Sequence, residues 1–224
     1  MAALDEDSGG GSLLARIRFV LVEPTHSGNV GAVARAMKNM GLTRLCLVNP
    51  KCAIDADAIA RAAGADDLLA AADLVRTLPE ALIGCRLVVG TSARRRHLDW
   101  PMLDPRACGE RLVAEVGEGE SRNDVALILG RESSGLSNEE LARCHFLAHI
   151  PTNPGFSSLN LAAAAQVFAY EVLSALHRRH RGPAADATPT DLAPAEAMEA
   201  FHIHLAETLV DLGFGHAEQS HRLL

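Results

Sequence analysis

Short runs of consecutive apolar residues alternate along the chain with stretches in which apolar residues recur every three or four positions. Arg16–Glu23 is such a run, rich in branched side chains and followed by Pro24, which is typical of a buried strand. In the next segment, Asn29–Met40, apolar residues have helical spacing, and Gly41 is placed to end a helix. A strand followed directly by a helix is therefore predicted.

The same two patterns recur down the chain. Four further runs are predicted to be strands: Thr43–Val48, Arg86–Gly90, Val125–Gly130 and Phe146–Ile150. Six further segments are predicted to be helices: Ala56–Ala63, Asp66–Leu74, Glu110–Val116, Asn138–Arg143, Leu159–His177 and Ala195–Leu212. Ser157 or Ser158 is placed to cap the long helix. Because strands alternate with helices and are mostly continuous apolar runs, we expect an α/β domain built on a mostly parallel sheet.

Composition divides the chain into four parts. Residues 1–14 are acidic and glycine-rich at their start and are expected to form a flexible tail. Residues 15–180 contain all the predicted strands and form the α/β domain. Residues 181–193 are rich in proline, alanine and aspartate, as a linker would be. Residues 194–224 resume a helical pattern and are expected to form a small helical extension.

The charge balance limits the classes of partner. With 21 Lys and Arg against 28 Asp and Glu, the formal net charge is −7, which argues against unselective coating of nucleic acid. Local basic clusters leave RNA possible as a partner, although any one of them alone is more simply explained as a solvated face. These clusters are Arg16 with Arg18, Lys38 with Arg44, Arg94–His97 and Arg178–Arg181.

Hydrophobic residues make up 48% of the chain and charged residues 22%, a balance typical of a packed protein. No apolar run reaches the roughly 18 residues of a membrane span, and the acidic start is unlike a signal peptide. We therefore expect a cytoplasmic protein that does not contact membranes.

The cysteines and histidines predict neither a disulfide framework nor a metal site. The 5 cysteines include no C-x-x-C pair, and the 10 histidines include no H-E-x-x-H. His202 and His204 lie in a predicted helix and would point apart. No metal is expected.

Four of the predicted strands end in loops of glycine and small polar residues: residues 24–31, 90–94, 130–136 and 151–160. Ligands of parallel sheets bind at the carboxyl ends of strands, so four such loops favour a single pocket. The common signatures are absent, however. No G-x-G-x-x-G follows the first strand, the Gly130–Gly135 spacing lacks the lysine of a phosphate-binding loop, and there is no G-x-S-x-G.

Three motifs in these loops resemble those of a known family. They are NVGAVAR at Asn29–Arg35 with Gly41, LILGRESSGL at Leu127–Leu136, and the segment from Ile150 to Ala162 that contains SSLNLA. In this order they closely resemble the SPOUT RNA methyltransferases, specifically the TrmH-like branch that methylates ribose 2′-hydroxyls. The resemblance covers residues 16–178 and is greatest to the members that modify nucleotide 32 in the anticodon loop of tRNA.

The resemblance implies a deep C-terminal trefoil knot, an exception to the rule that chains do not thread loops. The loops after the third to fifth predicted strands would hold S-adenosyl-L-methionine in a bent shape, with S-adenosyl-L-homocysteine as product. Members of the family are homodimers whose active sites form across the interface, and tRNA would be the substrate. Such chains usually continue further and turn basic, so ending at Leu224 suggests a truncated extension.

The resemblance assigns the reaction to five residues. Arg35 is the catalytic residue of the family; because a guanidinium stays protonated, we interpret it as a clamp that holds a phosphate and lowers the pKa of the hydroxyl. The phosphate or a water would then accept the proton. Asn29 and Glu132 would orient substrate or a neighbouring loop, with a helix cap and a salt bridge as their alternatives. Ser158 and Asn160 would arrange the ribose and cofactor, with capping as the alternative.

Cofactor contacts are expected mainly from backbone atoms, which small residues leave accessible. Nine residues are assigned to them: Thr91, Ser92, Ala93, Leu129, Gly130, Ile150, Ser157, Ser158 and Leu159. RNA contacts are expected from Arg94, Arg95 and Arg96. His26 is either an RNA contact or an ordinary turn residue.

Other functions stay open from the sequence alone. The enzyme could modify another tRNA position or ribosomal RNA. The chain could instead be an RNA-binding relative without catalysis, or a nucleotide-binding regulatory module.

Overall fold

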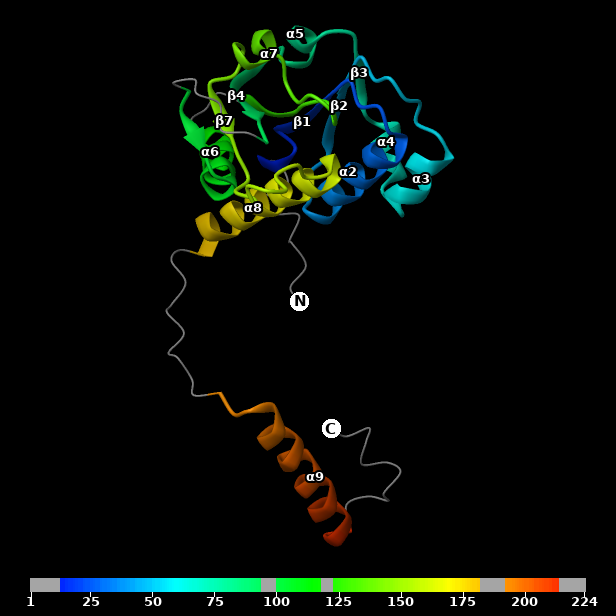
Figure 1. Cartoon of the computed structure of the whole chain (residues 1–224), viewed down its shortest axis with the longest axis vertical. Coiled ribbons are helices and arrows are strands. Elements are labelled where there is room, and N and C mark those ends of the chain that lie inside the picture. Colours follow the sequence, from blue (N-terminus) through cyan, green and yellow to red (C-terminus); the bar gives the residue numbers. More distant parts are fainter. Residues whose placement is uncertain (1–12, 94–99, 118–122, 182–191, 214–224) are drawn as a thin grey trace. The chain divides into compact units, whose positions relative to one another are not determined.

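The computed structural model describes residues 13–93, 100–117, 123–181 and 192–213. The chain divides into two units, Met1–Pro183 and Ala184–Leu224. The first contains the sheet, and the second contains the helix α9 (Ala195–Asp211) (Figure 1). Among the helices in the described ranges, none combines the length and apolar character needed to cross a membrane.

Within the described residues, seven strands form one sheet in the order β3-β2-β1-β6-β4-β7-β5. Every neighbouring pair is parallel, which confirms the predicted α/β class. The strands are β1 (Ile17–Val22), β2 (Arg44–Val48), β3 (Asp73–Val75), β4 (Cys85–Thr91), β5 (Met102–Leu103), β6 (Asp124–Leu129) and β7 (Phe146–Ala148).

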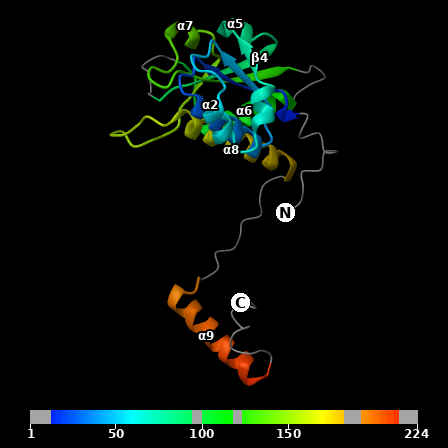
Figure 2. The same cartoon turned by 90° about the vertical axis from the view of Figure 1, so that its right-hand side faces the viewer.

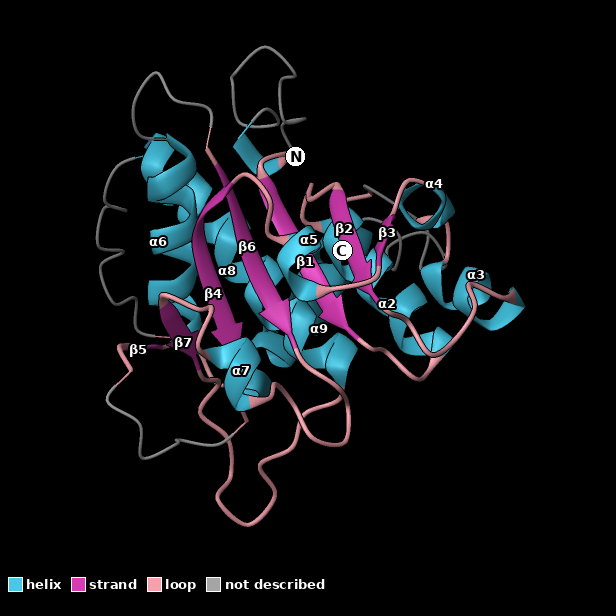
Figure 3. Cartoon of the chain, turned by 90° about the horizontal axis from the view of Figure 1, so that it is seen from above, coloured by secondary structure: helices cyan, strands magenta, loops and turns pink. Residues whose placement is uncertain are grey.

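Helices cover both faces of this sheet (Figure 3). They are α2 (Ser27–Asn39), α3 (Ala56–Ala62), α4 (Asp66–Ala70), α5 (Leu78–Ala81), α6 (Pro105–Gly117), α7 (Asn138–Leu141) and α8 (Leu161–Arg181). Phe19 and Leu21 of β1 pack in the core cluster formed with α2, α3, α4, α6 and α8. Val20 and Val22 belong to the cluster on the other face, with α5 and α7. Because both faces are covered, β1 is continuously apolar from Phe19 to Val22 rather than alternating.

The direction of α2 is set by a close crossing with α3. A Cβ built on Gly31 would lie 2.0 Å from the carbonyl oxygen of Ala58, so only glycine fits at this crossing. The glycine of the first motif therefore has a packing role. It fixes the helix whose first turn carries Asn29.

Two short edge strands depart from the sequence prediction. The predicted helix Asp66–Leu74 ends at Ala70, and Asp73–Val75 instead pairs with β2 as strand β3. Leu74 is 64% exposed there. Edge strands of this length bury too little to produce a readable pattern, and the two-residue β5 was missed for the same reason.

The long helix begins at Leu161 rather than Leu159. The side chain of Asn160 accepts hydrogen bonds from the N–H groups of Ala162 (2.9 Å) and Ala163 (3.4 Å). The predicted serine cap at Ser157 or Ser158 is therefore wrong, and Asn160 takes that position.

Three residues of the basic clusters bond to other parts of the fold. Arg18 is only 7% exposed and lies 3.2 Å from Asp124, which also pairs with Arg44 at 2.7 Å. Arg16 donates to the backbone carbonyl of Val116 at 2.6 Å. Arg16 and Arg18 are thus bonded within the fold, and Arg44, whose side chain is 36% exposed, joins β2 to β6 through Asp124.

Candidate functional site

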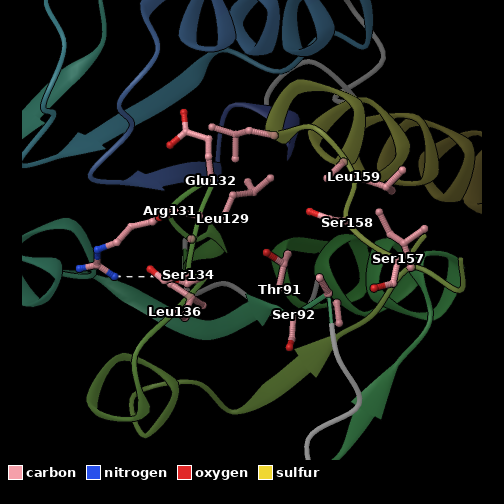
Figure 4. Close-up of a pocket in the computed structure, with 18 of the residues that line it drawn as sticks. Thr91, Ser92, Leu129, Arg131, Glu132, Ser134, Leu136, Ser157, Ser158 and Leu159 are labelled. Atoms are coloured by element: carbon pink, nitrogen blue, oxygen red, sulfur yellow. Dashed lines mark hydrogen bonds between the residues drawn. The ribbon is translucent and has the colours of Figure 1, made fainter. Parts of the chain in front are cut away.

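A cavity of about 450 Å³ lies at the carboxyl ends of β4, β6 and β7 (Figure 4). It is lined by the loop after β4, the loop after β6 and the segment between β7 and α8. Leu161, Ala164 and Phe168 contribute the wall formed by α8. Since ligand pockets typically measure about 300–1,000 Å³, the cavity can accept a small molecule.

All nine residues assigned to the cofactor line this cavity. Thr91 and Ser92 lie across from Ser157 and Ser158 in Figure 4. The remaining five are Ala93, Leu129, Gly130, Ile150 and Leu159. The structure thus brings together residues from three separate loops.

The loop after β1 does not line this cavity, so the expectation of four loops around one pocket is wrong in that respect. It lines a neighbouring polar hollow of about 490 Å³ instead, together with the start of α3. Glu132 connects the two hollows, because it lines the first and bonds to Thr25 and Asn29 in the second.

The loop after β6 is braced from both sides. Arg131 and Gly135 exchange backbone hydrogen bonds of 3.2 and 2.9 Å. The guanidinium of Arg131 pairs with Glu23 at 2.6 Å and Glu140 at 2.9 Å. In Figure 4 it lies on the side of the loop away from Ser157 and Ser158. These hydrogen bonds to Glu140 and Glu23 raise the pKa of Arg131, and the bond from Arg131 lowers the pKa of Glu23. The loop shape is therefore set by internal ion pairs.

Glu132 is held as a carboxylate by neutral donors. The N–H and the Oγ1 of Thr25 donate to it at 3.2 and 3.1 Å, and Nδ2 of Asn29 donates at 3.3 Å. Burial, the largest single influence, raises the pKa of Glu132, but the hydrogen bonds together outweigh it and the pKa is lowered. Glu132 is thus ionised at neutral pH, and the bonds found for it within the described residues do not form the salt bridge considered as an alternative.

Asn29 lies in the first turn of α2 but is not its cap, since the N-cap residue is His26. Its Oδ1 accepts a hydrogen bond of 2.9 Å from Nδ2 of Asn160. The side chains of Glu132, Asn29 and Asn160 are therefore linked, and we call them the Glu132–Asn29–Asn160 network. Because Glu132 can only accept, it fixes the amide of Asn29 with Nδ2 toward Glu132 and Oδ1 toward Asn160.

Arg35 does not join this network in the described part of the chain. It lies on the exposed side of α2, does not line the cavity, and has no hydrogen-bond or ion-pair partner among the described residues. Arg35 is six positions after Asn29, which corresponds to a rise of about 9 Å along the helix. Within the described part of one chain no hydrogen bond joins Arg35 to Ser158 or Asn160, and its expected placement beside them stays a prediction.

The residues predicted to contact RNA are only partly described. His26 is exposed in the loop after β1, and its N–H donates to Glu132 at 3.4 Å. Arg94, Arg95 and Arg96 lie outside the described residues.

Sequence reasoning missed three supporting residues. Arg131 and Thr25 shape the loop after β6 and hold Glu132, as described above. Nδ1 of His149 lies 3.0 Å from the carbonyl oxygen of Ser92 and supports the loop after β4. The motif match could have indicated Arg131, which sits between Gly130 and Glu132, but no sequence spacing reveals its partners Glu23 and Glu140.

Neither metal nor thiolate chemistry is indicated by the described side chains. No group of three or more His, Cys, Asp or Glu residues in the described ranges is placed to hold a metal ion. Burial raises the pKa of Cys108 to about 12 and that of Cys144 to about 12, so both thiols stay protonated at neutral pH. The cavity instead offers small residues, hydroxyls and an ionised carboxylate at its border.

Fold and site together define a methylase. Residues 16–170 match the model of the SpoU rRNA methylase family, and the chain belongs to that family. This confirms, at the level of the family, the RNA methyltransferase expected from the three motifs.

Individual members of the family are similar to the chain in sequence and in structure. The chain is 54% identical over 203 residues to the tRNA (cytidine/uridine-2′-O-)-methyltransferase TrmJ of Salmonella typhimurium, covering 90% of this chain and 82% of the relative. A probable methylase family protein from Haemophilus influenzae has a similar structure, with a TM-score of 0.69 and 40% identity over 94% of this chain and 86% of that one.

The SpoU methyltransferase AviRb from Streptomyces viridochromogenes, solved with AdoMet, shares the fold. Its TM-score is 0.55 at 23% identity, and the match covers 73% of this chain and 60% of that one.

Proposed function

We propose that the protein transfers a methyl group from S-adenosyl-L-methionine to the ribose 2′-hydroxyl of nucleotide 32 in the anticodon loop of tRNA. The observation that carries the proposal is the Glu132–Asn29–Asn160 network, which joins all three motifs beside a ligand-sized cavity. The 54% identical relative, named as a tRNA 2′-O-methyltransferase, supports the substrate class. Nucleotide 32 rests on the resemblance of the motifs.

The cavity residues fit this donor. Leu129, Ile150 and Leu159 offer apolar surface for an adenine ring, and the small residues Thr91–Ala93 and Gly130 leave backbone groups accessible. When bound, S-adenosyl-L-methionine supplies a methyl group on a positively charged sulfur, which reacts with oxygen without help from a metal. The AdoMet complex of a protein with the same fold supports this assignment.

The protein's part is alignment and charge stabilisation. Asn160, fixed by Asn29 and by the first turn of α8, orients the ribose together with Ser158. Arg35 holds a phosphate of the RNA and stabilises the developing alkoxide. The proton of the hydroxyl passes to that phosphate or to a water. The guanidinium cannot accept it, because arginine is already protonated.

A second copy of the chain completes the site in this proposal. Arg35 is exposed on α2 and outside its own cavity, so it is available to the donor site of a partner subunit in a homodimer. The knotted topology, the helical extension and RNA contacts from Arg94–Arg96 belong to the same proposal. The protein would meet its tRNA in the cytoplasm.

A direct methylation assay tests the proposal. Unmodified tRNA transcripts and labelled S-adenosyl-L-methionine should give one methyl group per tRNA, mapped by mass spectrometry to the ribose of nucleotide 32. The control transcript carries a 2′-deoxy sugar at nucleotide 32 only, and its methylation should fall to background. Methylation elsewhere would reject that position, and no transfer to any tRNA or rRNA would reject the activity.

A further inference from the structure

Phe156 is a large apolar side chain displayed at the border of the site. It is 81% exposed, whereas Phe19 and Phe168 of the same unit are fully buried in the core. It belongs to the segment between β7 and α8, which projects from the body of the unit as an olive-yellow loop in Figure 2. The motif resemblance assigned roles to the residues after it and none to Phe156.

The loop that carries Phe156 has a defined shape. The N–H of Phe156 donates to the carbonyl oxygen of Asn153 at 2.9 Å, and the N–H of Gly155 donates to Oδ1 of Asn153 at 2.9 Å. On the other side, Oγ1 of Thr152 donates to the carbonyl oxygen of Ser157 at 3.2 Å. The ring is thus presented on a hydrogen-bonded turn, which lowers the entropy cost of using it for binding.

Phe156 directly precedes residues of the candidate site in the sequence. Ser157 and Ser158 directly follow Phe156 and line the cavity, and Asn160 belongs to the Glu132–Asn29–Asn160 network. Two residues of backbone span at most about 7 Å, so the backbone of Phe156 lies within about 7 Å of that of Ser158, which the proposed function assigns to the ribose.

The surroundings of Phe156 favour a nucleobase over a protein surface. The exposed apolar residues Pro154 and Leu159 lie in the same loop. The polar residues Asn153 and Ser157 stand among them, so the loop does not form the continuous apolar centre of a stable protein interface. A single exposed ring flanked by amide and hydroxyl groups is the arrangement that stacks an unpaired base and bonds its sugar and phosphate.

We infer that Phe156 stacks on a nucleobase of the RNA substrate, at the methylated nucleotide or its direct neighbour, and thereby positions the ribose. This inference rests on the proposed function and adds a binding residue to it. Stacking on one face tolerates different bases, so this contact does not itself select the base.

The experiment compares wild type with Phe156→Ala and Phe156→Trp in steady-state methylation of a tRNA transcript. Loss of one stacked base should raise KM for tRNA about 10-fold to 100-fold in Phe156→Ala, while Phe156→Trp retains a KM within a few fold of wild type. The affinity for S-adenosyl-L-homocysteine should be unchanged in both. Circular dichroism checks folding, which an exposed side chain should not affect.

Abasic transcripts give the second readout. Three transcripts each lack one base, at nucleotide 32 or at one of its two neighbours. Only the transcript that lacks the stacked base should abolish the KM difference between wild type and Phe156→Ala. In Phe156→Trp, the added indole fluorescence should be quenched by tRNA, compared with wild type, whose one tryptophan is Trp100.

Each alternative has its own result. Equal KM values for wild type and Phe156→Ala would overturn the inference while leaving methylation intact. A change of oligomeric state in Phe156→Ala, with unchanged tRNA affinity, would also overturn it and assign the ring to a contact between copies of the chain. Failure of the proposed function would show differently, as no methyl transfer by wild type itself.

Discussion

Replacing Arg35 by alanine is expected to lower the rate of methyl transfer to tRNA about 100-fold to 1,000-fold, the range measured when a group that stabilises developing negative charge is removed. Arg35 is exposed and has no partner among the described residues, so the substitution should leave the melting temperature unchanged. Arg35 is assigned to a phosphate of the RNA and not to the cofactor, so the affinity for S-adenosyl-L-homocysteine should stay within about twofold. Single-turnover kinetics measure the rate, and scanning and titration calorimetry measure the melting temperature and the affinity.

Two variants separate the geometry of Arg35 from its charge. Arg35→Lys keeps the charge but loses the planar, two-pronged donor, so it should recover only a small part of the rate. Lys38→Ala removes a cation one turn further along α2 that is already bound to Asp67 at 2.7 Å and to the carbonyl oxygen of Gly64 at 2.8 Å. It should therefore leave turnover unchanged. If Arg35→Ala retained more than a tenth of the wild-type rate, Arg35 would lose its assigned role.

The apolar pattern predicted the central elements of the fold, because a strand buried on both faces has a run of apolar residues that is easily recognised in the sequence. All residues of β1 are buried, so its run of apolar residues could be recognised without knowing its neighbours. The edge strands were missed for the opposite reason. In β3, Asp73 and Leu74 are exposed, and a three-residue strand gains its order from pairing with β2, which is a tertiary effect.

The site was predictable in its members and not in its connections. The motif match named Asn29, Glu132 and Asn160, but their hydrogen bonds join positions more than 100 residues apart, and no local spacing encodes them. The capping preference of serine suggested Ser157 or Ser158 for the start of α8. The structure uses Asn160, because its side chain can cap the helix with Oδ1 and still reach Asn29 with Nδ2.

Gly130→Ala is expected to weaken binding of S-adenosyl-L-homocysteine about 100-fold, with an equal loss of turnover at limiting cofactor, since two backbone segments must separate to admit the methyl group. A Cβ on Gly130 would lie 2.4 Å from the carbonyl carbon of Gly135 and 2.5 Å from the backbone nitrogen of Leu136. Backbone atoms cannot rotate away as a side chain can. The loop would have to open its two hydrogen bonds between Arg131 and Gly135, and the wall of the cavity would move with it.

Gly135→Ala is the matched control in the same loop. A Cβ at Gly135 meets no atom within 4 Å, but the residue has a φ of +69°. Alanine at this position then costs only the strain of a left-handed backbone, on the order of 1–2 kcal/mol. The cavity wall formed by the loop after β6 is not displaced. Isothermal titration should rank the affinities as wild type, then Gly135→Ala, then Gly130→Ala. A Gly130→Ala affinity equal to that of Gly135→Ala would contradict the steric explanation.

The Gly130→Ala variant also shows whether Arg35 acts within one subunit or across two. Mixed dimers of Arg35→Ala and Gly130→Ala contain one intact cavity, on the subunit that lacks Arg35. If Arg35 serves its own subunit, both sites of the mixed dimer are inactive. If it serves the partner, the intact cavity faces an intact arginine, and an equimolar random mixture should recover about a quarter of the wild-type rate, because half of the dimers are mixed and each has one working site. Recovery is therefore expected on mixing, and its absence would place Arg35 and the cavity that it serves in the same chain.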